Sequence, residues 1–190
     1  MIEWLDHIDK ELFIFLNGLH TDSFDRAMLW ITAKNSWIPL YLLIVGFIIY
    51  TKRWKSIWIF IAITLLITMS DQITSGLMKP FFERLRPCHN PILADVVYNI
   101  GKCGGQFGFA SSHAANTFAI ATFIWLVFKK DHGWFIWMFL WSALISYSRI
   151  YVGVHYPGDV LFGAVIGIIS GVGIHSLYAF LTRKFSPQTF

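Results

Sequence analysis

SIWIFIAITLLITMSDQITSGLM, residues 56–78, and VLFGAVIGIISGVGIHSLYAFL, residues 160–181, are the two stretches that decide the fold. A helix of about 20 apolar residues, rising 1.5 Å per residue, crosses the ~30 Å hydrocarbon core of a bilayer, and both stretches meet that length. Three shorter apolar stretches occupy residues 36–51, 112–128 and 133–147. The pattern predicts an all-α polytopic membrane helix bundle with about five transmembrane helices.

The composition supports a membrane protein and excludes several other classes. Hydrophobic residues make up 56% of the 190 residues and charged residues only 14%, whereas a soluble domain carries about 25% charged residues. The 18 Phe, 9 Trp and 7 Tyr suit lipid-facing and interfacial positions. The formal charge of +4 is spread without a polybasic patch, so we expect membrane lipids as partners and no nucleic acid.

The amino-terminal region, residues 1–35, mixes Asp6, Asp9, Lys10 and Glu11 with apolar residues. This mixture predicts an amphipathic helix lying on the membrane surface; a sixth span is the alternative. No basic segment precedes an apolar one there, so we expect no cleavable signal peptide. No linker divides the chain, so we expect a single domain over residues 1–190, with the transmembrane bundle at residues 36–181.

Basic residues set the expected orientation. They gather in the link after the first span, in the link after the third, and in the tail: Lys52, Arg53, Lys55, Lys129, Lys130, Arg183 and Lys184, with Asp131 as the one acid. With five spans these segments share one side, which the positive-inside rule makes cytoplasmic. The loops at residues 79–111 and 148–159 then face outward, and the cations near their span ends suggest an anionic ligand.

Three motifs converge on that outer side. They read KPFFERLRP (residues 79–87), FASSH (residues 109–113) and SRIYVGVHYPGD (residues 148–159). Each is weak alone, because Arg86 and Arg149 could simply anchor span ends in lipid headgroups. Together they place three cations, two imidazoles and a carboxylate at one membrane surface.

In these motifs the chain resembles the type 2 phosphatidic acid phosphatases, a family that includes vanadium haloperoxidases. The family pattern is Lys, six residues, Arg-Pro; then Pro-Ser-Gly-His; then Ser-Arg, five residues, His, three residues, Asp. The chain matches the first and third parts at every fixed position and reads Ala110-Ser111-Ser112-His113 in the second. Pro is thus replaced by Ala and Gly by Ser, which bears on how closely the backbone at Ser112 approaches a phosphate.

The resemblance implies a phosphate site made from all three motifs. Its members are Lys79, Arg86, Ser111, Ser112 and Arg149. Lysine supplies a point charge, and each arginine a fork that holds two oxygens. Backbone N–H groups of Ser111 and Ser112, at the start of a helix, are expected to point at the anion. These groups suit the charge that spreads over three oxygens in phosphoryl transfer.

The resemblance also implies the catalytic residues. His155 attacks phosphorus and forms a phosphohistidine, Asp159 fixes its tautomer, and His113 protonates the leaving oxygen and later activates water. Cations then replace a metal ion, so no cofactor is expected. His89 beside Cys88 is too sparse for a metal site.

Several residues outside this set admit two interpretations. Arg84 is expected to anchor in headgroups, and Asp71 to hydrogen bond to Ser or Thr on a neighbouring helix rather than relay protons. Gly163, Gly167 and Gly171 form a small-residue stripe, which we assign to contacts within the bundle; a homodimer is the alternative. Cys88 and Cys103 share the outer loop, where we expect a disulfide.

The resemblance therefore implies metal-independent removal of phosphate from a membrane lipid phosphate or diphosphate. The site would face the periplasm or exterior at a bacterial inner membrane. Undecaprenyl diphosphate ranks first because the compact chain has no extra domain for a bulky headgroup. Phosphatidylglycerophosphate, lipid A phosphate and phosphate transfer between lipids remain alternatives. A haloperoxidase is disfavoured because that branch is soluble.

Overall fold

The computed structural model describes residues 2–185, which form helices and loops without a strand. The long helices are α1 (Ile2–Asn17), α2 (Asp22–Thr32), α3 (Ile38–Lys52), α4 (Ser56–Asp71), α6 (Ser112–Phe128), α7 (Trp137–Tyr151) and α8 (Pro157–Phe185). The short elements are η1 (Lys34–Trp37), η2 (Arg53–Lys55), the π-helical η3 (Gln72–Met78), α5 (Lys79–Phe82), η4 (Pro87–His89), η5 (Pro91–Leu93) and η6 (Gly133–Ile136). The predicted all-α class is confirmed.

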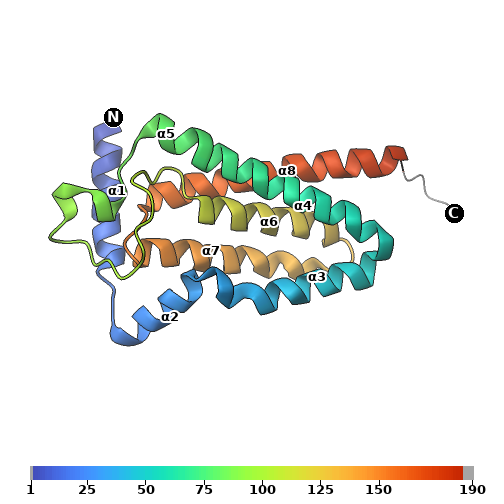
Figure 1. Cartoon of the computed structure of the whole chain (residues 1–190), viewed down its shortest axis with the longest axis horizontal. Coiled ribbons are helices and arrows are strands. Elements are labelled where there is room, and N and C mark those ends of the chain that lie inside the picture. Colours follow the sequence, from blue (N-terminus) through green and yellow to red (C-terminus); the bar gives the residue numbers. More distant parts are fainter. Residues whose placement is uncertain (1, 186–190) are drawn as a thin grey trace.

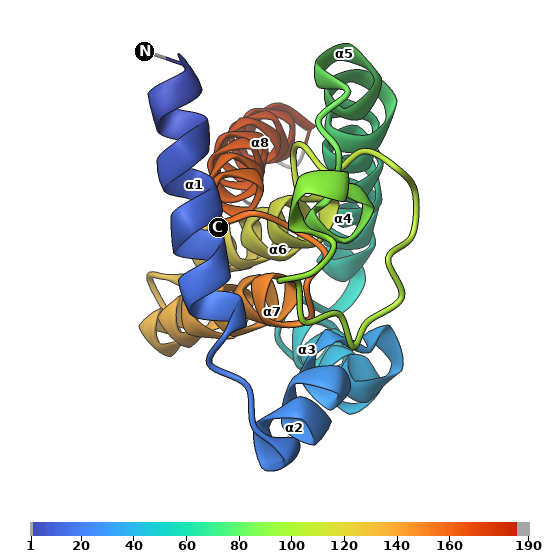
Figure 2. The same cartoon turned by 90° about the vertical axis from the view of Figure 1, so that its left-hand side faces the viewer.

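Helices α3, α4, α6, α7 and α8 lie side by side, and α1 crosses one end of this bundle (Figure 1). The turns from α3 to α4 and from α6 to α7 lie at the other end, as does the end of α8 (Figure 1). The basic segments predicted to share one side of the membrane therefore share one end of the bundle. The three motifs gather at the opposite end, beside α1 (Figure 2).

The glycine stripe of α8 packs against α6. A Cβ at Gly163 would collide with the Ser111 carbonyl oxygen, and one at Gly167 with the Ala115 carbonyl oxygen. At Gly171 it would lie 2.7 Å from the Thr122 Cβ. Small residues let two helix backbones approach closely, so the stripe serves a contact within the bundle, as expected.

Apolar side chains fill the bundle and also cover its outside. The core cluster includes Ile48, Leu66, Phe123, Phe128 and Met138, all without exposed surface. Large apolar side chains on the outer faces stay exposed, among them Leu43, Trp58, Leu140 and Ile169. Exposed apolar surface of this extent is typical of helices that face lipid.

Within residues 2–185, two helical stretches are long and apolar enough to cross a membrane: Lys34–Phe82 and Pro157–Lys184. The first has 49 residues and turns back at Arg53, whose φ is 47°, so it contributes both α3 and α4. Helix α6 has the predicted bounds of residues 112–128, whereas α7 continues to Tyr151, beyond the predicted end at residue 147. Helix α8 exceeds its predicted stretch at both ends.

The amino-terminal region holds two helices where one was predicted. Helix α1 ends at Asn17 beside Gly18, and Thr21 caps α2 by accepting a hydrogen bond from the Phe24 N–H at 3.4 Å. A glycine followed by a capping threonine is a common signal for one helix ending and another beginning. Helix α1 crosses the end of the bundle instead of running parallel to the bundle helices (Figure 1). This is the orientation expected of a helix that lies on the membrane surface.

Candidate active site

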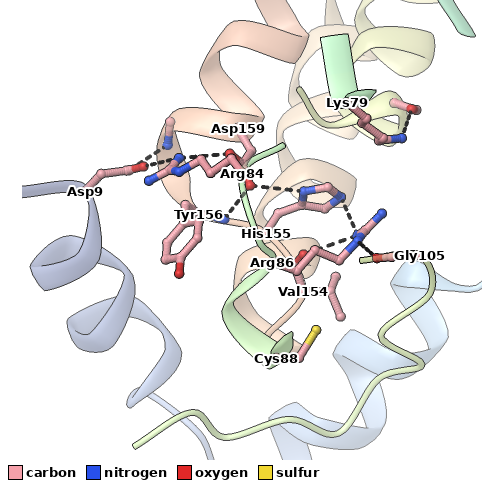
Figure 3. A network of polar contacts seen from close by, with 12 residues as sticks. Asp9, Lys79, Arg84, Arg86, Cys88, Gly105, Val154, His155, Tyr156 and Asp159 are labelled. Carbon is pink, nitrogen blue, oxygen red and sulfur yellow. Dashed lines mark hydrogen bonds and ion pairs between the residues drawn. The ribbon is translucent and has the colours of Figure 1, made fainter. Parts of the chain in front are cut away.

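His155 and Asp159 form a buried pair at the end of the bundle where α1 lies. The His155 side chain is 2% exposed and the Asp159 side chain 0%, and the imidazole Nδ1 lies 3.3 Å from the carboxylate Oδ2. On the other side of the ring, the Arg86 Nη1 lies 3.0 Å from Nε2 (Figure 3). A guanidinium only donates, so Nε2 is the acceptor and Nδ1 carries the proton toward Asp159. The lone pair of Nε2 therefore faces away from the carboxylate.

The end of α7 sets the spacing between Arg149 and His155. Gly153 follows the helix with φ of 82°, and its N–H donates to the Ile150 carbonyl at 3.0 Å. The Val154 N–H donates to the Arg149 carbonyl at 3.1 Å. These two bonds form a Schellman motif, which requires a left-handed residue that glycine adopts without strain. The turn brings His155 back beneath the end of α7.

The start of α8 places Asp159. Pro157 opens the helix, a position where its missing N–H costs nothing. The Asp159 Oδ2 accepts the Tyr156 N–H at 3.0 Å, so the carboxylate caps its own helix from the third position in the manner of a capping box. The Asp159 Oδ2 thus caps the start of α8 and also contacts the His155 Nδ1. This double use explains why the two residues are four positions apart.

A short antiparallel bridge between Leu85 and Phe107 brings two segments of the outer loop together at the pair. On one side, the Arg86 Nε donates to the Gly105 carbonyl at 2.7 Å and the Nη1 to the Val154 carbonyl at 3.2 Å. On the other side lies Gly108, where a Cβ would be 3.0 Å from the Asp159 Oδ2 and 3.6 Å from the His155 Nδ1. Sequence reasoning missed Gly108, because nothing local marks a glycine that packs on a distant pair.

Lys79 lies in a hydroxyl cluster where the π-helical segment η3 meets α6. Its Nζ donates to the Ser112 Oγ at 2.7 Å and to the Ser75 Oγ at 3.0 Å. The Thr74 Oγ1 donates to the same Ser112 oxygen at 2.9 Å. Ser112, which replaces the family's glycine, therefore ties its hydroxyl to Lys79. π-Helical segments are frequent at functional sites.

Ser111 departs from its expected role. Its N–H donates to the Asp159 carbonyl at 2.9 Å, so the expectation that this N–H points at an anion is wrong. The bond instead joins the start of α6 to the start of α8. The Ser111 Oγ is buried without a partner in the described structure, as is the Arg149 Nε. The Arg149 Nη1 donates to the Thr32 Oγ1 at 2.6 Å.

A cavity of about 450 Å³ joins these groups. Its lining includes the residues that the motifs single out for phosphate binding and catalysis: Lys79, Arg86, Ser112, His113, Arg149 and His155. Asp159 and Ser111 lie behind this surface, buried. The structure thus brings residues from α5, α6, α7 and two loops to a single cavity. The cations in its lining make the cavity suitable for an anion.

The lining of the same cavity also includes Trp37, Tyr41, Asp71 and Asn116. Asp71 accepts a hydrogen bond from Ser75 of its own helical run at 3.4 Å, so the expected partner on a neighbouring helix is not found among the described residues. The Asn116 Oδ1 is buried and has no hydrogen-bond partner in the part of the chain that the structure describes. A larger cavity of about 810 Å³ lies at the other end of the bundle, far from these residues.

Arg84 has a different role from the headgroup anchor that was expected. Its Nη1 lies 2.9 Å from the Asp159 Oδ1 and its guanidinium lies over the Tyr156 ring, 4.2 Å from the centroid. The side chain therefore reaches inward, to the buried Asp159 carboxylate. The prediction failed because the partner of Arg84 is 75 residues away in the chain.

Burial controls the protonation state of His155. Loss of water lowers the pKa of the imidazole to about 4, although the Asp159 carboxylate opposes the shift. The imidazole is therefore neutral near pH 7, as a nucleophile requires.

The outer loop is joined by a disulfide between Cys88 and Cys103. In the described part of the chain, Cys88, His89 and Cys103 form a group with metal-ligand side chains close together. Its two sulfurs are bonded to each other, and a thiolate is the form that binds metal. The group therefore does not suit a metal ion.

Comparisons with known proteins agree with this geometry. Residues 60–183 match the PAP2 superfamily. The chain is 40% identical over 194 aligned residues to the lipid A 4'-phosphatase of Bacteroides thetaiotaomicron, covering 100% of this chain and 85% of that protein. It is 35% identical to the lipid A 4'-phosphatase of Porphyromonas gingivalis, covering 96% and 78%. Among solved structures, Aquifex aeolicus LpxE aligns with a TM-score of 0.64 and 29% identity, covering 87% of this chain and 93% of that one.

The matched region contains all three motifs, and with them the motif residues that line the cavity. The resemblance found in the sequence is therefore confirmed: the chain belongs to the PAP2 superfamily and is a phosphatase, a hydrolase of phosphoric esters.

Proposed function

We propose that the enzyme removes a phosphate from a lipid A-type glycolipid at the outer face of a bacterial inner membrane, through a phosphohistidine and without a metal ion. The observation that carries the proposal is the 40% identity to a lipid A 4'-phosphatase over the whole chain, together with a cavity that joins His155 to three cations. The sequence alone ranked undecaprenyl diphosphate first, and the relatives favour the lipid A alternative instead.

The reaction begins when the phosphate enters the cationic part of the cavity. The Arg86 guanidinium, now 3.0 Å from the His155 Nε2, turns to the phosphate oxygens and leaves the lone pair free for phosphorus. As the Nε2–P bond forms, the bond from phosphorus to the lipid oxygen breaks. His113 protonates that oxygen, and the Asp159 carboxylate stabilises the charge that develops on the His155 ring.

The second step releases inorganic phosphate. His113, now neutral, takes a proton from water, and the hydroxide attacks phosphorus as the N–P bond breaks. Lys79 and Arg149 balance the charge of the phosphoryl oxygens throughout. Fixed cations supply the neutralisation that Mg²⁺ supplies in other phosphoryl-transfer enzymes.

The uncharged and acidic side chains in the lining favour a sugar headgroup. Trp37 and Tyr41 offer flat apolar surfaces, and Asp71 and Asn116 offer acceptors for hydroxyl or amide donors. A phosphate on a polyprenyl chain brings no such donors. A glycolipid phosphate therefore matches more of the lining than a prenyl phosphate does.

Undecaprenyl diphosphate remains the second candidate because of two further cations. Lys34 and Lys102 also line the cavity, beyond the three cations that a single phosphate uses. A second phosphate group would engage them. Phosphate transfer to another lipid uses the same intermediate, and release of phosphate without an acceptor lipid separates hydrolysis from transfer.

The proposal places the bundle across the membrane with five spans. The domain is residues 1–190, with residues 1–35 at the outer interface and residues 36–181 spanning. The cationic turns at the end of the bundle away from the site would then face the cytoplasm. A membrane-impermeant thiol reagent should label a cysteine placed at Asn90 in intact spheroplasts and spare one placed at Lys130; the reverse pattern would overturn this orientation.

The substrate proposal is tested with purified enzyme in detergent. Lipid A bearing a 4'-phosphate, undecaprenyl diphosphate and phosphatidylglycerophosphate are compared by kcat/KM for phosphate release, with His155→Ala as the inactive control. We expect lipid A to be the best substrate by about tenfold or more. A preference for undecaprenyl diphosphate would overturn the glycolipid assignment and leave the reaction in place.

A further inference from the structure

Helix α1 presents two different faces at the end of the bundle. Its outward face carries exposed apolar side chains: Trp4, Leu5, Ile8, Leu12 and Phe15. Its inward face carries Asp6, Asp9, the buried Phe13 and the buried Asn17, at the spacing of a single helix side. An anchor at the membrane surface requires only the first face. The carboxylates on the second face therefore call for a separate explanation.

Those carboxylates meet Arg84, which stands between α1 and the active site. The Arg84 Nη1 lies 2.8 Å from the Asp9 Oδ2 and 2.9 Å from the Asp159 Oδ1, and its Nη2 lies 2.9 Å from the Asp6 Oδ1. One nitrogen thus joins the carboxylate of α1 to the catalytic carboxylate of α8 (Figure 3). Burial alone would lower the pKa of Arg84, but Asp159 and Asp9 outweigh it and raise the pKa, so the guanidinium stays charged.

Asp9 also contacts the start of α8 directly. The Gly158 N–H donates to the Asp9 Oδ1 at 2.7 Å, and a Cβ at Gly158 would lie 2.7 Å from the Asp9 Oδ2. A glycine at this position is what lets α1 come so close. Asp9 therefore holds the first turn of α8 by its backbone while it aims Arg84 at a side chain of the same turn.

Asp159 depends on these contacts because no part of it is exposed to water. Its Oδ2 is used by the Tyr156 N–H and the His155 Nδ1, which leaves Arg84 as the donor to Oδ1. Without Arg84 in place, this oxygen would be buried and unpaired, and the carboxylate would turn to find another donor. Such a turn would move Oδ2 away from the imidazole.

We propose that Asp9 and Arg84 are positioning residues of the reaction: Asp9 aims the Arg84 guanidinium, which fixes Asp159 so that its other oxygen holds the His155 Nδ1–H. The inference rests on the proposed phosphohistidine reaction. It gives α1 a part in catalysis in addition to its place at the membrane surface. Asp9 lies outside the three motifs that identify the family, and Arg84 occupies a variable position of the first motif.

The first test is Asp9→Asn in the full-length enzyme. The asparagine oxygen still accepts the Gly158 N–H, but the charge that aims Arg84 is gone. We expect kcat to fall about 10- to 100-fold, by analogy with the loss that follows removal of a hydrogen-bond partner behind a metal ligand, with KM within about twofold. Asp9→Glu should recover part of the loss. The matched control is Glu11→Gln, which removes the same charge from an exposed position of the same helix and should keep wild-type kcat.

A double-mutant cycle separates positioning from simple support of the fold. If Asp9 acts through Asp159, Asp9→Asn should lower kcat in the wild-type background and change it less than about twofold in Asp159→Asn. Equal losses in both backgrounds, or a normal kcat in Asp9→Asn, would overturn the inference. Full activity in His155→Ala would instead overturn the proposed reaction, so the two failures are distinct.

Discussion

Gly108→Ala tests whether the contact between His155 and Asp159 sets the rate. An alanine Cβ there would lie 3.0 Å from the Asp159 Oδ2 and 3.2 Å from the Arg86 Cγ, so a neighbour must move by a few tenths of an ångström. The bond between the His155 Nδ1 and this oxygen is already 3.3 Å long. The same shift takes it past 3.5 Å, where a hydrogen bond no longer holds.

The expected cost is about tenfold in kcat, because a full ångström of misplacement in an active site costs roughly 100-fold and this shift is smaller. A tenfold loss corresponds to about 1.4 kcal/mol of transition-state stabilisation. The assay is steady-state release of phosphate in detergent, with the thermal midpoint measured in parallel. Gly173→Ala is the control, since a Cβ there would have no neighbour within 4 Å among residues 2–185. A Gly108→Ala enzyme with normal kcat would show that the pair tolerates displacement and would refute the reasoning.

Three further predictions concern acidity, packing and metals. Because burial lowers the pKa of His155 to about 4, kcat/KM should fall only as the pH drops through about 4, after correction for the substrate's own ionisation near pH ~6. A loss of kcat/KM centred on the ordinary pKa of histidine would contradict the burial argument. Gly167→Leu should lower the thermal midpoint, since overpacking costs about 1–3 kcal/mol where α8 meets the Ala115 carbonyl. Gly173→Leu, in open space, should not lower it, and equal midpoints for the two variants would count against the stripe. Activity should survive excess EDTA and be blocked by vanadate, and a loss restored by Mg²⁺ would reject the metal-free mechanism.

The sequence predicted the helices because hydropathy is a local signal. Residues 112–128 became α6 without change, and residues 56–78 became α4 with its π-helical continuation. The ends were less predictable where polar residues continue a helix. Helix α7 runs on to Tyr151 because its last turn closes with the glycine of a Schellman motif, not because the residues are apolar.

For the site residues too, contacts that are local in the sequence were predictable and long-range contacts were not. His155 and Asp159 are four positions apart, so their contact follows from one helix start and is readable from the sequence. Arg84 was misjudged and Gly108 missed, because their partners lie far along the chain. The role of Ser111 failed for the same reason, since its N–H meets the carbonyl of Asp159 on another helix. The way α1 crosses the bundle end decides which residues Asp9 contacts. No local sequence pattern indicates this crossing, so the contacts of Asp9 could not be predicted.

The most direct test of the central claim is to trap the phosphoenzyme. Wild-type, His155→Ala and His113→Ala enzymes are mixed with labelled p-nitrophenyl phosphate, whose leaving group departs without a proton donor, and are quenched in alkali. His113→Ala should accumulate an acid-labile, alkali-stable label on His155, because attack still occurs while water lacks its base. His155→Ala should carry none. Label on the His155→Ala enzyme would contradict the account, since the nucleophile would then be another residue.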